Sequence, residues 1–167
     1  MNDELTKVDL EKMQQEIDYR ITVLRPQLIE EVQQARAFGD LSENFEYKEA
    51  KRQKNRNESR IRYLRQMIRT ANVVEVDSAA DEVGLFDTVG LYLPASDTEM
   101  TVRMVTTLRV DPFNNLISRE SPLGGAIFGR RVGDEVTVQV NPEFSYPVRI
   151  VSIQKGEDDA SLEIAKY

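Results

Sequence analysis

The stretch GDLSENFEY, residues 39–47, separates two long segments that have the residue spacing of α-helices. Before it, from about residue 6 to residue 38, apolar or small side chains recur at steps of three and four: Leu10, Met13, Ile17, Ile21, Leu24, Leu28, Val32 and Ala35. After it, from about residue 42 or 43 to residue 70, the same steps connect Tyr47, Ala50, Lys54, Asn57, Ile61, Leu64 and Ile68. Two long helices joined by so few residues fold back on each other, so the sequence predicts an antiparallel coiled-coil hairpin.

Pro26 lies inside the first helical segment. A proline removes one backbone hydrogen bond and bends a helix. Because the apolar pattern keeps its phase across Pro26, we expect one continuous helix with a bend.

Beyond residue 71 the pattern changes to the alternation of β-strands. Strands are predicted at Leu85–Leu93, Met100–Leu108, Leu116–Arg119, Glu135–Val140 and Val148–Ile153. The stretch SPLGGAIFG, residues 121–129, predicts one short helix, with Ser at the N-cap, Pro at the first position and Gly after the last turn. The fold class is therefore α+β: a finger domain over residues 1–77, a small α+β domain over 78–155, and a mobile acidic tail over 156–167.

The composition excludes several kinds of chemistry. The 167 residues contain no Cys and no His, which excludes thiol nucleophiles, disulfides, Cys/His zinc sites and histidine general bases. The N-terminus has no apolar signal region, and no apolar run approaches the roughly 18 residues of a membrane span. We expect a cytoplasmic protein with no membrane partner.

Two carboxylates, Asp40 and Glu43, lie in the predicted hairpin turn, and their spacing allows two interpretations. In the structural one, Asp40 is the N-cap of the second helix and Glu43 completes a capping box. In the functional one, both act at the end of the rod. Mg²⁺ takes six oxygen ligands, so two carboxylates are too few for a site in the free protein but enough to complete one in a partner's phosphoryl-transfer centre.

The charge distribution is uneven. The chain carries a net charge of −7, but residues 36–69 contain ten basic and five acidic residues. Basic residues at steps of four form a stripe on the second helix: Lys48, Arg52, Arg56 and Arg60. Lys51 widens this stripe, and Arg36 adds charge from the facing helix. This stripe is either a solvated helix face with pairs such as Glu58–Arg62, or a surface that binds RNA phosphates.

Three stretches resemble the bacterial transcript-cleavage factors of the GreA and GreB family. They are RAFGDLSENFEY (residues 36–47), NLIS (115–118) and SPLGGAIFG (121–129), and the similarity covers about residues 5–153. The resemblance implies a coiled-coil finger followed by a domain of the FKBP-like fold, which docks at the rim of the secondary channel of RNA polymerase. The finger enters this channel, and its acidic tip helps the polymerase's own active site to cut backtracked RNA.

The resemblance also implies roles for individual residues. Asp40 and Glu43 are the catalytic tip acids and share Mg²⁺ with the polymerase, Ser42, Asn44 and Tyr47 support the tip, and Arg36 and Lys51 belong to a basic patch. The implied partners are bacterial RNA polymerase and the 3′ end of nascent RNA, and we expect a monomer that is not itself an enzyme.

Two other functions stay open at this point. The chain could occupy the same channel as an inhibitor or modulator without stimulating cleavage, although the intact pair of tip acids counts against this. A peptidyl-prolyl isomerase activity is suggested by fold analogy alone.

Overall fold

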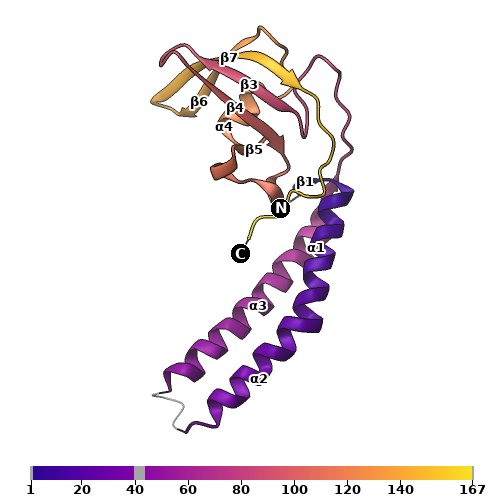
Figure 1. The fold of residues 1–167 in the computed structure, drawn as a ribbon, viewed down its shortest axis with the longest axis vertical. Coiled ribbons are helices and arrows are strands. Elements are labelled where there is room, and N and C mark those ends of the chain that lie inside the picture. The colour runs from indigo at the N-terminus through magenta and orange to yellow at the C-terminus, as the bar shows by residue number, and fades with distance from the viewer. Residues whose placement is uncertain (1, 40–43, 167) are drawn as a thin grey trace. The chain divides into compact units, whose positions relative to one another are not determined.

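The computed structural model describes residues 2–39 and 44–166, which form two compact units (Figure 1). The helical unit contains Leu10–Ala71, and the α+β unit contains Asp3–Asp9 and Asn72–Lys166. The predicted fold class, a helical hairpin followed by a small α+β domain, is confirmed. Within the described residues, no helix is both long and apolar enough to cross a membrane.

The first arm of the hairpin is continuous across Pro26. It consists of α1 (Lys7–Tyr19), a π-helical turn (Arg20–Leu24) and α2 (Arg25–Arg36). The backbone N–H of Arg25 reaches back to the carbonyl of Arg20, and Pro26 falls in the first turn of α2. A proline is tolerated in a first turn, so the wider π turn lets the helix continue through it.

The second arm is α3 (Phe45–Thr70), which begins two or three residues later than predicted. Most of the buried apolar side chains of the hairpin lie far from the tip, with Ile61, Leu64 and Met67 on α3 and Met13 and Ile17 on α1, while Val32 and Ala35 lie nearer to it. This agrees with a hairpin whose packing energy is concentrated away from its tip.

The α+β unit is built on a five-stranded sheet. Its strands, in the spatial order β5-β4-β3-β7-β6, are β3 (Thr88–Leu93), β4 (Thr98–Val105), β5 (Leu116–Ser118), β6 (Glu135–Asn141) and β7 (Phe144–Gln154). Neighbours are antiparallel except β4 and β5, which are parallel. All five predicted strands are present, but Thr107–Arg109 forms a 3₁₀ turn instead of the end of a strand.

The short helix α4 (Pro122–Ile127) starts as predicted. The Ser121 hydroxyl accepts a hydrogen bond from the backbone N–H of Gly124 at 3.0 Å. Gly124 itself has a packing role, because a Cβ there would collide with the backbone carbonyl of Ser118. Ile127 joins the buried core of the sheet, so α4 closes one face of the unit.

The N-terminal segment Asp3–Asp9 belongs to the α+β unit rather than to the finger. Its strand β1 (Glu4–Leu5) pairs in parallel with β2 (Asn72–Val73), which follows α3. The predicted boundary at residue 77 missed this pairing, because two-residue strands have no periodicity that a sequence pattern can show.

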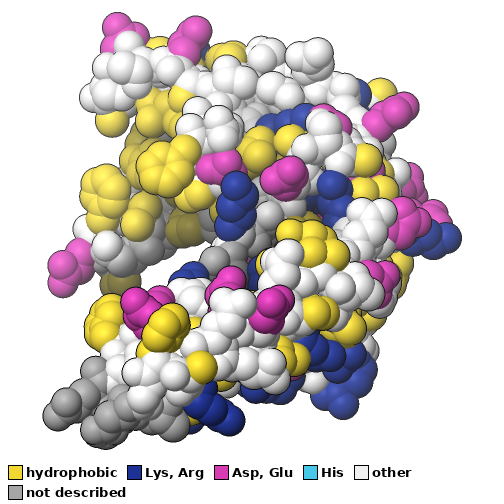
Figure 2. Space-filling model, turned by 60° about the horizontal axis from the view of Figure 1, so that its bottom comes forward, with side chains coloured by type: hydrophobic (Ala, Val, Ile, Leu, Met, Phe, Trp, Pro, Cys, Tyr) yellow, Lys and Arg dark blue, Asp and Glu magenta, His cyan; other side chains and the backbone are white. Residues whose placement is uncertain are grey.

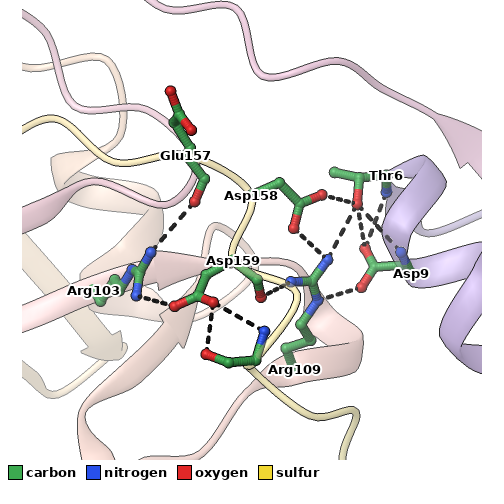
Figure 3. A network of polar contacts seen from close by, with 8 residues as sticks. Thr6, Asp9, Arg103, Arg109, Glu157, Asp158 and Asp159 are labelled. Atoms are coloured by element: carbon green, nitrogen blue, oxygen red, sulfur yellow. Dashed lines mark hydrogen bonds and ion pairs between the residues drawn. The ribbon is translucent and has the colours of Figure 1, made fainter.

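A buried arginine holds the residues that follow β7 (Figure 3). Arg109 is fully buried, and its Nε donates to Asp9 Oδ1 at 2.6 Å. Its Nη2 pairs with Asp158 at 2.7 Å, and its Nη1 donates to the backbone carbonyl of Asp159 at 3.1 Å. The sequence predicts a mobile tail from residue 156, whereas residues 158 and 159 are fixed here, because a buried guanidinium requires partners.

Candidate functional site

The predicted tip acids Asp40 and Glu43, together with Ser42, lie outside the described residues. The structure does describe the chain on both sides of them. On one side α2 ends at Arg36, and on the other α3 begins at Phe45. The contacts of these flanking residues show what holds the end of the hairpin.

Asn44 caps α3 and joins it to α2. Its Oδ1 accepts a hydrogen bond from the backbone N–H of Tyr47 at 3.0 Å, and its Nδ2 donates to the carbonyl of Ala35 at 2.7 Å. The interpretation of Asp40 as the N-cap, with Glu43 completing a capping box, is therefore wrong. Asn is as good an N-cap as Asp, so cap preference alone did not distinguish the two positions.

Tyr47 and Arg36 make a second contact between the arms. The Arg36 guanidinium lies 5.7 Å from the centre of the Tyr47 ring. A hydrogen bond from Arg36, and the positive charges of Lys51 and Lys54, lower the pKa of the Tyr47 phenol. Asn44 and Tyr47, both predicted as tip supports, thus each contact α2.

Five of the six predicted basic-patch residues are exposed in the structure: Arg36, Lys48, Lys51, Arg52 and Arg56. Arg52 pairs with Glu49 at 3.0 Å, in an exposed contact of the kind that contributes little to stability. Figure 2 shows groups of Lys and Arg side chains along the lower edge of the face it draws. The stripe is therefore accessible to a polyanion.

Arg60 does not belong to this exposed stripe. It is buried, and its guanidinium binds both carboxylate oxygens of Glu16, at 2.8 and 3.2 Å. Four residues are slightly more than one turn of an α-helix, so positions four apart lie on a line that winds around the helix. Arg60 therefore lies on the same side of α3 as the buried Ile61 and Leu64. Glu58 forms its salt bridge with Arg25, at 2.7 Å, and not with Arg62, although the hydrogen bond from Arg25 and the positive charge of Arg62 both lower the pKa of Glu58.

A groove of about 370 Å³ lies between the arms next to the stripe. Its walls carry two guanidinium groups, two amides and two leucines: Arg20, Arg56, Gln53, Asn57, Leu24 and Leu28. Arg20 is held by Glu16 at 2.8 Å and by Asn57 at 2.9 Å. The groove is therefore joined to the exposed stripe through Arg56, while Glu16 compensates the charge of Arg20.

Sequence reasoning missed two polar groups. One is the cluster of Glu16 and Arg20 with Asn57 and Arg60, which the polar position of Asn57 in the predicted seam could have signalled. The other is the start of α1, where the backbone N–H of Thr6 donates to Asp9 and the N–H of Asp9 points back to the Thr6 hydroxyl. The spacing TKVD, residues 6–9, is a capping-box pattern.

Comparison with known proteins places this architecture in a family. Residues 4–73 match the family model "Transcription elongation factor, N-terminal", and residues 78–155 match "Transcription elongation factor, GreA/GreB, C-term". The transcription elongation factor GreA of Thermoanaerobacter pseudethanolicus is 42% identical over 152 residues, which cover 90% of this chain and 96% of that protein. GreA of Bacillus subtilis is 40% identical over 150 residues, 89% of this chain and 94% of that protein.

Among solved structures, GreA factor homolog 1 of Thermus thermophilus is 26% identical to this chain. The match covers 93% of this chain and 100% of that one, with a TM-score of 0.41. The two family models and the GreA sequences decide the assignment: the chain belongs to the GreA/GreB family of transcription elongation factors.

Proposed function

We propose that this protein inserts its helical hairpin into the secondary channel of RNA polymerase and stimulates the polymerase's own cleavage of backtracked RNA. Asp40 and Glu43 are the acids that act in this reaction. The protein works as a monomer and supplies no active site of its own. Its α+β unit docks at the rim of the channel.

The capping of α3 by Asn44 is the observation that carries the proposal. A capping residue uses its side chain to satisfy a backbone N–H at the start of a helix. Since Asn44 fills this role through the N–H of Tyr47, the start of α3 does not require Asp40 or Glu43 as a cap. The capping of α3 thus gives no reason for the two acids, which supports the functional interpretation.

The donor set of the two acids fits a shared Mg²⁺ ion rather than a resident one. Mg²⁺ is usually held by one or two protein carboxylates, with water and phosphate oxygens completing its six ligands. Asp40 and Glu43 would supply that protein share, and the ion would polarise the phosphate and its attacking water.

The exposed basic patch supports the RNA part of the proposal. Lys48, Lys51 and Arg52 extend from the first turn of α3 away from the tip, and Arg36 faces them from the end of α2. Exposed cations in this arrangement bind phosphates by releasing counterions. The 3′ segment of a backtracked transcript would run along this surface.

A stalled-complex experiment tests the proposed function. RNA polymerase halted with a 3′-extended transcript is incubated with Mg²⁺, with and without the protein, and transcript length is followed. We expect shortened transcripts that can be extended again, and intact RNA when the polymerase is omitted. Binding to the polymerase without shortening would favour the inhibitor function instead, and cleavage of free RNA would place the chemistry in this chain.

A further inference from the structure

A layer of polar side chains crosses the helical unit, with Asn57 and Arg60 buried and Glu16 and Arg20 about one fifth exposed. Arg60 and Asn57 on α3 are 4% and 3% exposed. Arg60 binds Glu16 of α1 through two nitrogens, at 2.8 and 3.2 Å. Asn57 accepts from Arg20 Nη1 at 2.9 Å and donates to the Arg20 backbone carbonyl at 3.3 Å. Arg20 also donates to Glu16 at 2.8 Å, so the four residues form one connected network.

Burying this network costs free energy, because its charged and polar groups lose their contacts with water. The burial of Glu16 acts to raise its pKa, but the hydrogen bonds and charges of Arg60 and Arg20 outweigh burial, and the net shift is downward. Apolar side chains of similar volume often stabilise a protein as well as a buried ion pair does, or better. Stability alone therefore does not explain a polar layer here.

Axial alignment does explain it. Apolar side chains at steps of three and four recur on the same face at every helical turn. Two such helices can therefore be displaced by one turn, about 5 Å, and still bury apolar surface. A slide of this size would move Arg60 away from Glu16 and Asn57 away from Arg20. It would leave buried charges unpaired, which is far more costly than a shifted apolar contact.

We propose that the Glu16–Arg20–Asn57–Arg60 layer sets the axial register of the two arms and thereby the reach of the tip. These four are positioning residues. The consequence for cleavage rests on the proposed function, but the register itself does not. The π turn at Arg20–Leu24 begins in the layer, and the Arg20 carbonyl accepts from both the backbone N–H of Arg25 and the side chain of Asn57.

Spin labels on the full chain measure the register directly. The protein contains no Cys, so Gln33→Cys and Arg65→Cys give two unique labels on opposite arms, separated mainly along the hairpin axis. With the layer intact we expect one label-to-label distance. In the variant Glu16→Leu, Asn57→Leu, Arg60→Leu we expect a second distance, changed by about 5 Å, with helix content unchanged.

The pair Arg25–Glu58 provides the matched control. It also bridges the two arms with two hydrogen bonds, at 2.7 and 3.0 Å, but both side chains are about one third exposed. The variant Arg25→Leu, Glu58→Leu should keep the single distance. If the triple variant does not fold, Asn57→Leu alone serves, with a smaller second population expected.

A single unchanged distance in the layer variant would overturn the proposal, and so would an equal effect of the Arg25–Glu58 variant. Cleavage is measured in parallel at saturating factor. A register effect lowers the maximal cleavage rate in proportion to the slipped population, while affinity for the polymerase stays unchanged. If even the wild-type protein fails to stimulate cleavage, the proposed function is wrong, but the label distances still decide the register.

Discussion

The two units differ in where their buried polar side chains lie. The sheet of the α+β unit has an apolar core of strand residues such as Leu91, Met104 and Ile150, and the buried Arg109 is not part of this cluster but binds the segments beside it. The hairpin is too thin for a separate core and places Asn57 and Arg60 inside its seam. A thick unit can thus obtain its specificity from packing, whereas a thin one needs polar contacts to select one alignment.

The largest effect is expected in the α+β unit, at Arg109. Arg109→Met leaves Asp9 and Asp158 without their cation, and we expect a loss of about 3–5 kcal/mol in the free energy of unfolding. Denaturant unfolding followed by circular dichroism measures it. Arg103→Met is the control, because Arg103 is 25% exposed and its partner Asp159 is 39% exposed. Equal losses of unfolding free energy in both variants would mean that burial of the arginine does not determine how much its removal destabilises the protein.

The next effect concerns the exposed face of the hairpin. Lys48→Glu with Lys51→Glu should slow cleavage of deeply backtracked RNA by about tenfold at low salt, with a smaller deficit as salt rises. Shallow backtracks should be affected less, since their RNA reaches fewer of these positions. The same charge change in Arg65→Glu with Arg69→Glu, further along α3, is the comparison. A deficit independent of salt and of backtrack depth would point to impaired docking.

A smaller effect is expected at the cap. Asn44→Ala should lower the free energy of unfolding of the hairpin by about 1 kcal/mol, because the N–H of Tyr47 loses its acceptor. Asn44→Asp keeps that acceptor and loses the donor to Ala35. Thermal unfolding should therefore place Asn44→Asp between the wild type and Asn44→Ala. If Asn44→Ala unfolds at the same temperature as the wild type, the cap does not stabilise the start of α3.

The smallest effect is a pH dependence of the hairpin. The pKa of Glu16 is lowered from its ordinary 4.5, so its ion pairs contribute stability above that value, and this contribution is lost as pH falls through the lower folded-state pKa. Glu16→Gln removes the titrating group. We expect stability curves that differ above pH 4.5 and converge in more acidic solution. Curves separated by the same amount at every pH would contradict this linkage.

The sequence predicted the elements of the fold well, because helices and strands have periods that survive in the order of residues. The hairpin, five strands and the capped helix at Ser121 are all present. The segment Asp3–Asp9 was assigned to the wrong unit, since its place depends on pairing with residues almost 70 positions away. The residues fixed by Arg109 were missed for the same reason.

The candidate site was predictable in part. Charge and spacing found the basic stripe, but they could not show that Arg60 turns into the seam and binds Glu16, since that depends on the phase of one helix against another. Cap preferences did not choose between Asp40 and Asn44, because both residue types accept a backbone N–H equally well. The structure resolved this choice through the distance from Asn44 to the N–H of Tyr47.

The central claim is that the tip acids serve cleavage and not folding, and the variant Asp40→Ala tests it most directly, because Ala neither binds a metal nor caps a helix. Cleavage of a backtracked transcript and thermal unfolding are measured on the same preparation, with Asn44→Ala alongside. The account predicts that Asp40→Ala loses stimulated cleavage and unfolds at the wild-type temperature, whereas Asn44→Ala unfolds earlier. Wild-type cleavage by Asp40→Ala, or a loss of cleavage matched by a loss of thermal stability, would contradict it.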